Sequence, residues 1–102
     1  MHKPEEVDVE VRHTVKPGEN IFEHIGFDKE EADNLKIRSD LMIAAEKLMI
    51  KKRMKQREAA ELFGISRPAV SDLVNGKVSK FSIDKLVIML ARAGKSVKVK
   101  VA

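Results

Sequence analysis

The helical spacing of apolar residues in the middle of the chain is interrupted at one glycine, Gly64. Between residues 56 and 75 apolar side chains recur three and four positions apart, but their phase changes at this glycine. Glycine adopts the left-handed conformation that ends a helix without steric cost, and Ser66 is a good N-cap for a second helix. Pro68 falls in the first turn of that helix, where its missing amide hydrogen is not needed. The pattern predicts two short helices joined by a tight turn. Their inner sides are expected to be formed by Ala59, Phe63, Ile65, Val70 and Leu73.

The outer side of the second predicted helix carries short polar residues around one arginine. These residues are Ser66, Arg67, Pro68, Ser71, Asp72 and Asn75. An α-helix fits the major groove of DNA, where arginine contacts guanine, asparagine contacts adenine and a small apolar group touches the thymine methyl. The alternative is that serine, asparagine and aspartate at helix ends serve only as caps. We favour a DNA-reading face, because the segment also meets the geometric demands of the turn before it.

Positive charge is concentrated just before this segment. The formal net charge of the chain is +4, and six cations fall within eleven residues: Lys47, Lys51, Lys52, Arg53, Lys55 and Arg57. Clustered cations favour a polyanionic partner. Cations near a helix C-terminus also offset the helix dipole, so the cluster alone is weak evidence.

The sequence lacks the usual features of enzymes and metal proteins. It has no cysteine, which excludes disulfides, thiolate zinc sites and thiol nucleophiles. Its three histidines, His2, His13 and His24, are eleven residues apart, about three helical turns, so no two are close enough along a helix to share a metal ion. It has no phosphate-binding glycine loop, no signal peptide and no apolar run long enough for a bilayer. We therefore predict a cytoplasmic protein that is not an enzyme, carries no metal or cofactor and does not contact a membrane.

Capping residues mark four further helical segments. They run from Asn20 to Gly26, from Asp28 to about Ile37, from about Ser39 to Lys52 and from Ser82 to Gly94. The second has few apolar residues and is expected on the surface. Before the last segment, Phe81 is placed to pack against Leu86. Ile88 and Met89 lie off its apolar stripe, which indicates contact with a second subunit or another protein, against the alternative of scattered surface residues.

Valines alternate with charged residues near both ends of the chain, at Val7, Val9 and Val11 and again at Val97, Val99 and Val101. A period of two predicts short strands, which can pair within one chain or across a dimer. Fraying of the terminus is the alternative for the first. We expect a mainly α fold, a compact bundle of about five helices with a short C-terminal strand. Its parts would be an N-terminal arm at residues 1–19, a DNA-binding domain at 20–95 and the strand at 96–102.

The segment QREAAELFGIS at residues 56–66, with Val70-Ser71 and Asn75-Gly76 after it, resembles the helix-turn-helix of the Xre and lambda Cro family. This resemblance implies a lambda repressor-like fold in which Gln56 touches the phosphate backbone. It also implies that Arg67, Pro68, Ser71 and Asp72 face bases. Similarity to compact regulators related to HigA-type antitoxins extends the match to Asn20-Ile21-Phe22 upstream and to Phe81-Ser82 through Gly94, Val97, Val99 and Val101 downstream. The resemblance therefore covers nearly all of the chain after Pro17.

Two residues depart from the family pattern. Lys55 stands where the family has threonine or serine, which removes a side-chain cap and places a cation near phosphate. Asp72 puts a negative charge on a face that meets a polyanion. It helps binding only if it accepts a hydrogen bond from a cytosine amine or orients Arg67, and we expect one of these two arrangements.

These observations predict a sequence-specific transcriptional regulator, a homodimeric repressor that places helix 66–75 of each subunit in the major groove of a pseudo-palindromic operator. The base-reading residues are expected to be Arg67, Pro68, Ser71, Asp72 and Asn75. The phosphate contacts are expected to be Lys52, Lys55, Gln56, Arg57, Ser66, Lys77 and Lys80. The alternative function is that of an antitoxin, which neutralises a small ribonuclease toxin by direct binding and represses its own operon.

Overall fold

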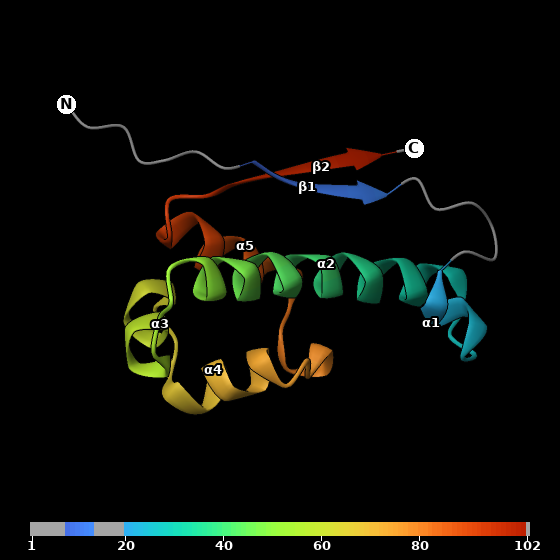
Figure 1. Ribbon diagram of the computed structural model, residues 1–102. Coiled ribbons are helices and arrows are strands. Elements are labelled where there is room, and N and C mark those ends of the chain that lie inside the picture. The colour runs from blue at the N-terminus through green and yellow to red at the C-terminus, as the bar shows by residue number, and fades with distance from the viewer. Residues whose placement is uncertain (1–7, 14–19, 102) are drawn as a thin grey trace.

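The structure is a computed structural model that describes residues 8–13 and 20–101 (Figure 1). Within these ranges the chain is mainly helical, as predicted. In chain order the elements are β1 (Asp8–His13), α1 (Ile21–His24), α2 (Lys29–Lys51), α3 (Gln56–Phe63), α4 (Arg67–Val74), the 3-10 helix η1 (Val78–Lys80), α5 (Ile83–Arg92) and β2 (Ser96–Val101). Val7 of the predicted first strand, and the predicted arm apart from β1, lie outside the described residues.

The long helix α2 is the central element, and α1, α4, α5, η1 and β1 all contact it. The sequence pattern predicted two helices here, one ending near Ile37 and another beginning near Ser39, and this was wrong. The segment contains no glycine or proline to end the helix, and an ion pair between Lys36 and Asp40 spans the expected break. The predicted cap is confirmed, since the carboxylate of Asp28 accepts the N–H of Glu31 at 2.9 Å.

The N-terminal half of α2 is not a surface helix, which corrects a second expectation. Ala32 and Leu35 are buried there, and α1 packs against this part of the molecule. The buried Asn20 joins the two helices, because its amide donates to the carbonyl of Ala32 at 3.0 Å while its Oδ1 accepts the N–H of Phe22 at 2.9 Å. A few apolar residues therefore suffice to bury this half, since a short docked helix covers them.

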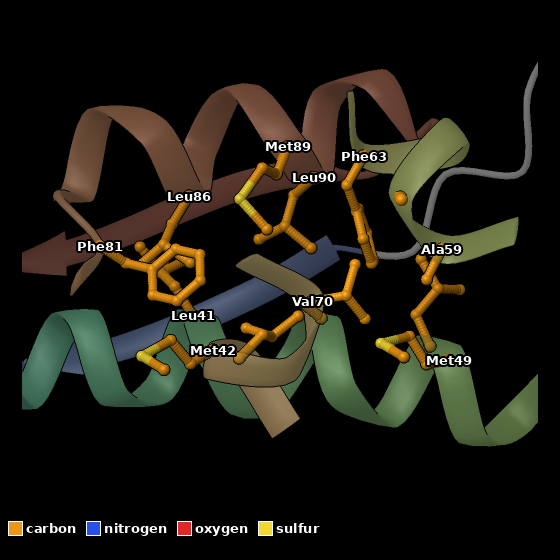
Figure 2. Close-up of a cluster of buried hydrophobic side chains, with 14 residues drawn as sticks. Leu41, Met42, Met49, Ala59, Phe63, Val70, Phe81, Leu86, Met89 and Leu90 are labelled. Carbon is orange, nitrogen blue, oxygen red and sulfur yellow. The ribbon is translucent and has the colours of Figure 1, made fainter. Parts of the chain in front are cut away.

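The hydrophobic core lies among α2, α3, α4 and α5 (Figure 2). Phe63, Phe81, Leu86 and Leu90 are among its fully buried side chains. Phe81 precedes the cap of α5 and lies with Leu86 in this core, which agrees with the predicted packing before that helix. The predicted cap is confirmed as well, because the Ser82 hydroxyl accepts the N–H of Lys85 at 3.1 Å.

Met89 was expected to contact a second subunit or another protein, because it lies off the apolar stripe of α5. This was wrong, since Met89 is buried in the core. The reason is that α5 contacts α2, α3 and β2, so that more than one narrow stripe of this helix is covered. Ile88, its neighbour, is exposed, with 60% of its surface accessible.

The two strands pair with each other within one chain and run parallel, with Val9 opposite Val97 and Val11 opposite Val99. The sequence had left pairing within a chain and across a dimer open. β1 contacts α2 and β2 contacts α5, and the sheet lies on the side of α2 away from α4 (Figure 1). The sheet therefore leaves the helix-turn-helix segment uncovered.

Arg53, just after α2, has a left-handed backbone with φ of +50°, and it is the only described residue other than glycine with positive φ. The N–H of Met54 donates to the carbonyl of Met49 at 2.9 Å, which closes the helix end around it. Because glycine takes this conformation without strain, Arg53→Gly is expected to raise the free energy of unfolding by about 1 kcal/mol. Urea unfolding measures this change.

The matched control for this prediction is Lys52→Gly, whose backbone has an ordinary φ of −91°. That variant gains no relief of strain and only adds freedom to the unfolded chain, so it should lower stability by about 0.5 to 1 kcal/mol. A loss of stability in Arg53→Gly equal to that in Lys52→Gly would contradict the prediction.

Candidate nucleic-acid interface

The turn between α3 and α4 has the geometry that the sequence predicted. Gly64 ends α3 in the left-handed conformation, with φ of +69°. Its N–H donates to the carbonyl of Ala60, and the N–H of Ile65 donates to the same carbonyl at 3.0 Å. The carbonyl of Ala60, in the last turn of α3, is therefore bonded within the turn itself. The chain therefore changes direction sharply at Gly64, and α4 begins as a separate helix (Figure 1).

The start of α4 is also as predicted. The Ser66 hydroxyl accepts the N–H of Ala69 at 3.2 Å, and Pro68 is the second residue of the helix. Val70 and Leu73 are buried in the core, which anchors one side of α4. Of the other predicted inner residues, Ala59 and Phe63 are buried, and Ile65 is half-buried against the core.

The opposite side of α4 carries the predicted base-reading residues. An α-helix turns once every 3.6 residues, so that Pro68, Ser71, Asp72 and Asn75 fall together on the side away from Val70 and Leu73. Arg67 lies at the edge of this face. We call these five outer residues, Arg67, Pro68, Ser71, Asp72 and Asn75, the outer face of α4.

Two of these side chains are held by each other. The amide of Asn75 donates to the Ser71 hydroxyl at 3.4 Å, across one helical turn. This leaves the Asn75 Oδ1 and one amide hydrogen for other partners, which is the combination that contacts adenine bidentately.

Asp72 has a partner that the sequence reasoning missed. Its Oδ1 lies 3.5 Å from the Nζ of Lys77, a partner that the sequence analysis did not consider. The sequence did contain a signal for this pair. Asn75-Gly76 is typical of a helix that ends in a left-handed residue, and such an end brings Lys77 back toward Asp72.

The predicted phosphate-contacting residues are all exposed and lie around α4 rather than on it. Lys52, Lys55, Gln56 and Arg57 belong to the end of α2 and the start of α3, while Lys77 and Lys80 follow the far end of α4 (Figure 1). Ser66 is at the turn. The polar face of α4 thus has cations beyond both of its ends, which is the distribution expected of a helix that approaches a polyanion.

Lys55 caps α3 without a side-chain acceptor, as expected from its departure from the family pattern. The Glu58 carboxylate accepts the Lys55 N–H at 3.3 Å, but an ammonium group cannot accept a bond in return. The amides at the start of α3 are therefore left without a bond from the capping side chain and stay available to an anion.

Arg92, at the end of α5, lies against the turn and was not identified from the sequence. A Cβ placed on Gly64 would be 2.6 Å from the guanidinium carbon of Arg92, so that this side chain covers the glycine directly. It lies close to the C-terminal end of α3, where a cation offsets the helix dipole. Nothing in the local sequence around Arg92 indicates this long-range contact.

A family model described as a helix-turn-helix domain matches residues 22–102, most of the chain. The chain belongs to this helix-turn-helix family. No curated protein matches the chain. Membership places it among the DNA-binding regulators, and α3 and α4 are the two helices of its helix-turn-helix. In helix-turn-helix proteins the second of the two helices is the one that reads the major groove, and α4 is the second helix of this pair.

No helix in the described part of this helix-turn-helix protein is both long and apolar enough to cross a membrane. Over the same residues, histidine, aspartate and glutamate do not form a group of three that could hold a metal ion.

Proposed function

We propose that this protein is a homodimeric repressor of the Xre and lambda Cro type, which reads a pseudo-palindromic operator with one α4 from each subunit. The observation that carries the proposal is the division of α4 into two sides. Val70 and Leu73 are buried, whereas on the outer face Arg67, Pro68 and Asn75 are exposed and Ser71 and Asp72 are half-buried. A helix held in this way presents its side chains to base edges without distortion of the fold.

Affinity and sequence choice are assigned to different residues. Arg67, Pro68, Ser71, Asp72 and Asn75 would read bases, and the exposed Lys52, Lys55, Gln56, Arg57, Ser66 and Lys80 would contact phosphates. Lys77 belongs to the predicted phosphate set as well, although it is paired with Asp72 in the free protein. In a symmetric dimer the two α4 helices would enter successive major grooves about 34 Å apart on one face of the duplex.

A binding selection from random duplexes tests the proposal. The expected result is one enriched palindrome, with half-sites spaced by one helical turn. Enrichment of a single half-site would contradict the proposed homodimer. Affinity without any sequence preference would overturn it in favour of a nonspecific DNA-binding protein.

Arg67→Ala and Lys55→Ala are expected to affect binding in different ways. Loss of Arg67 should relax preference at one base pair of each half-site and weaken binding to the selected operator by about 1 to 3 kcal/mol. Loss of Lys55 should weaken binding to all sequences alike and reduce the slope of log affinity against log salt by about one. Affinities for a set of single-base operator variants at several salt concentrations measure both effects. If the two variants lose affinity in the same pattern across that set, the division between base and phosphate contacts is wrong.

An antitoxin is the second candidate function, favoured by apolar surface away from α4. Ile21 in α1 and Ile25 just after that helix are 63% and 65% exposed, and Ile88 on α5 is 60% exposed. Exposed apolar residues of this kind mark contacts between proteins. Co-expression with the product of a short adjacent reading frame tests this function. Relief of that product's toxicity, together with a stable complex of the two purified proteins, is expected of an antitoxin, and toxicity that persists would exclude it for that partner.

A further inference from the structure

We propose that Asp72 reads a cytosine in the operator and that Lys77 is the residue that positions it, rather than a contact to the DNA backbone. This inference rests on the proposed function, because it requires that α4 enter the major groove. It assigns a base to one position of the outer face, and it gives Lys77 a role in sequence choice.

The backbone at the end of α4 brings the two residues together. The N–H of Lys77 donates to the carbonyl of Asp72 at 3.0 Å, and the N–H of Gly76 donates to the carbonyl of Leu73 at 3.1 Å. Gly76 between them is left-handed, with φ of +69°. These are the bonds of the Schellman motif, which places the second residue beyond the helix cap over the third residue from its end.

An apolar contact frequently accompanies this motif at the two positions that Asp72 and Lys77 occupy. Here the contact is an ion pair, 3.5 Å between Lys77 Nζ and Asp72 Oδ1, with side chains that are 55% and 30% exposed. An exposed ion pair adds little to stability. The pair is therefore better explained by what it does to the outer face of α4 than by what it does for the fold.

Lys77 has two effects on Asp72 that would favour its contact with DNA. The ammonium group offsets the negative charge of the carboxylate, which reduces its repulsion from the phosphates. It also engages only Oδ1, and Oδ2 makes no hydrogen bond with any described residue. A carboxylate oxygen is an acceptor only, and cytosine is the base that offers an amine donor without a neighbouring acceptor in the major groove.

The experiment repeats the duplex selection with Asp72→Asn and Asp72→Ala. In the wild type we expect cytosine at one position of each half-site. The amide of Asn both donates and accepts, and should change that preference to adenine, while Ala should lose it, with the four bases bound within about threefold of one another. All other operator positions should keep their preference, and thermal unfolding of the variants should match that of the wild type, because Asp72 is outside the core.

Lys77→Gln separates a positioning role from a phosphate contact. If Lys77 positions Asp72, discrimination in favour of cytosine should fall by on the order of tenfold, and Lys77→Arg, which keeps the charge, should restore it. A phosphate contact would instead weaken binding to every sequence alike, with the cytosine preference unchanged and the salt slope reduced by about one. Lys80→Gln, in η1, is the control that should show this second behaviour.

Failure of the inference is distinguishable from failure of the proposed function. An enriched palindrome whose preferred bases are the same in the wild type and in Asp72→Asn would overturn the role of Asp72 and leave the repressor intact. Weaker binding of Lys77→Gln to every sequence alike, with the cytosine preference unchanged, would overturn the role of Lys77. A wild-type protein that enriches no sequence would remove the proposed function itself, and the inference with it.

Discussion

Phe63→Ala is expected to lower the free energy of unfolding by about 3 to 5 kcal/mol, the largest effect of any substitution considered for this protein. Phe63 is 1% exposed and lies in the core between α3 and the facing helices (Figure 2). Its removal takes apolar area out of the core and leaves a cavity that the packed helices cannot close fully. Since small domains are stable by only about 5 to 15 kcal/mol, the loss is a large part of the total.

Urea unfolding and thermal melting both measure this loss, and the melting temperature should fall by roughly 15 to 30 °C. Ile50→Ala is the control, because Ile50 is also a large apolar residue but is 68% exposed. That variant should unfold within about 0.5 kcal/mol of the wild type. If both substitutions cost the same, the core does not lie where the structure places it.

Gly64→Val is expected to cost about 2 to 3 kcal/mol, the second largest effect. The backbone at Gly64 has φ of +69°, and a β-branched residue is severely strained in this conformation. A Cβ here would also lie 2.9 Å from Nη2 of Arg92, so that the guanidinium group must move away from the turn. Chemical denaturation measures the change in unfolding free energy.

Gly76→Val is the matched control, since Gly76 has the same φ of +69° but no atom within 4 Å of its added Cβ. It should carry the backbone strain without displacing Arg92 and therefore cost less than Gly64→Val. In an Arg92→Ala background the difference between the two valine variants should shrink. A Gly64→Val protein as stable as the wild type would mean that the turn is not held in the left-handed conformation.

The helix-turn-helix segment could be predicted closely from the sequence. The glycine that ends α3, the Ser66 cap and Pro68 in the first turn act on residues within four positions of themselves, so that local rules suffice. The outer face of α4 followed from helical periodicity alone. In the same way, the absence of an acceptor on Lys55 was enough to predict that α3 has no side-chain cap.

The predictions that failed depended on what covers each helix. The helices expected at 28–37 and 39–52 are one helix, because the charged residues between them form an ion pair and no helix breaker is present. Met89 was placed outside the core because one apolar stripe was assumed for α5, whereas three elements pack around that helix. The spacing of apolar residues shows which side of a helix is buried, but it does not show how many other helices and strands pack against that helix.

By itself, the sequence determined where this chain bends, how its helices begin and end, and which residues of α4 face outward, since each of these depends on contacts within one or two helical turns. Only the tertiary structure decided that β1 and β2 pair within one chain and that Arg92 covers the turn. Both contacts join segments that are distant in sequence. Such contacts are selected by the packing of the whole chain, which no local pattern encodes.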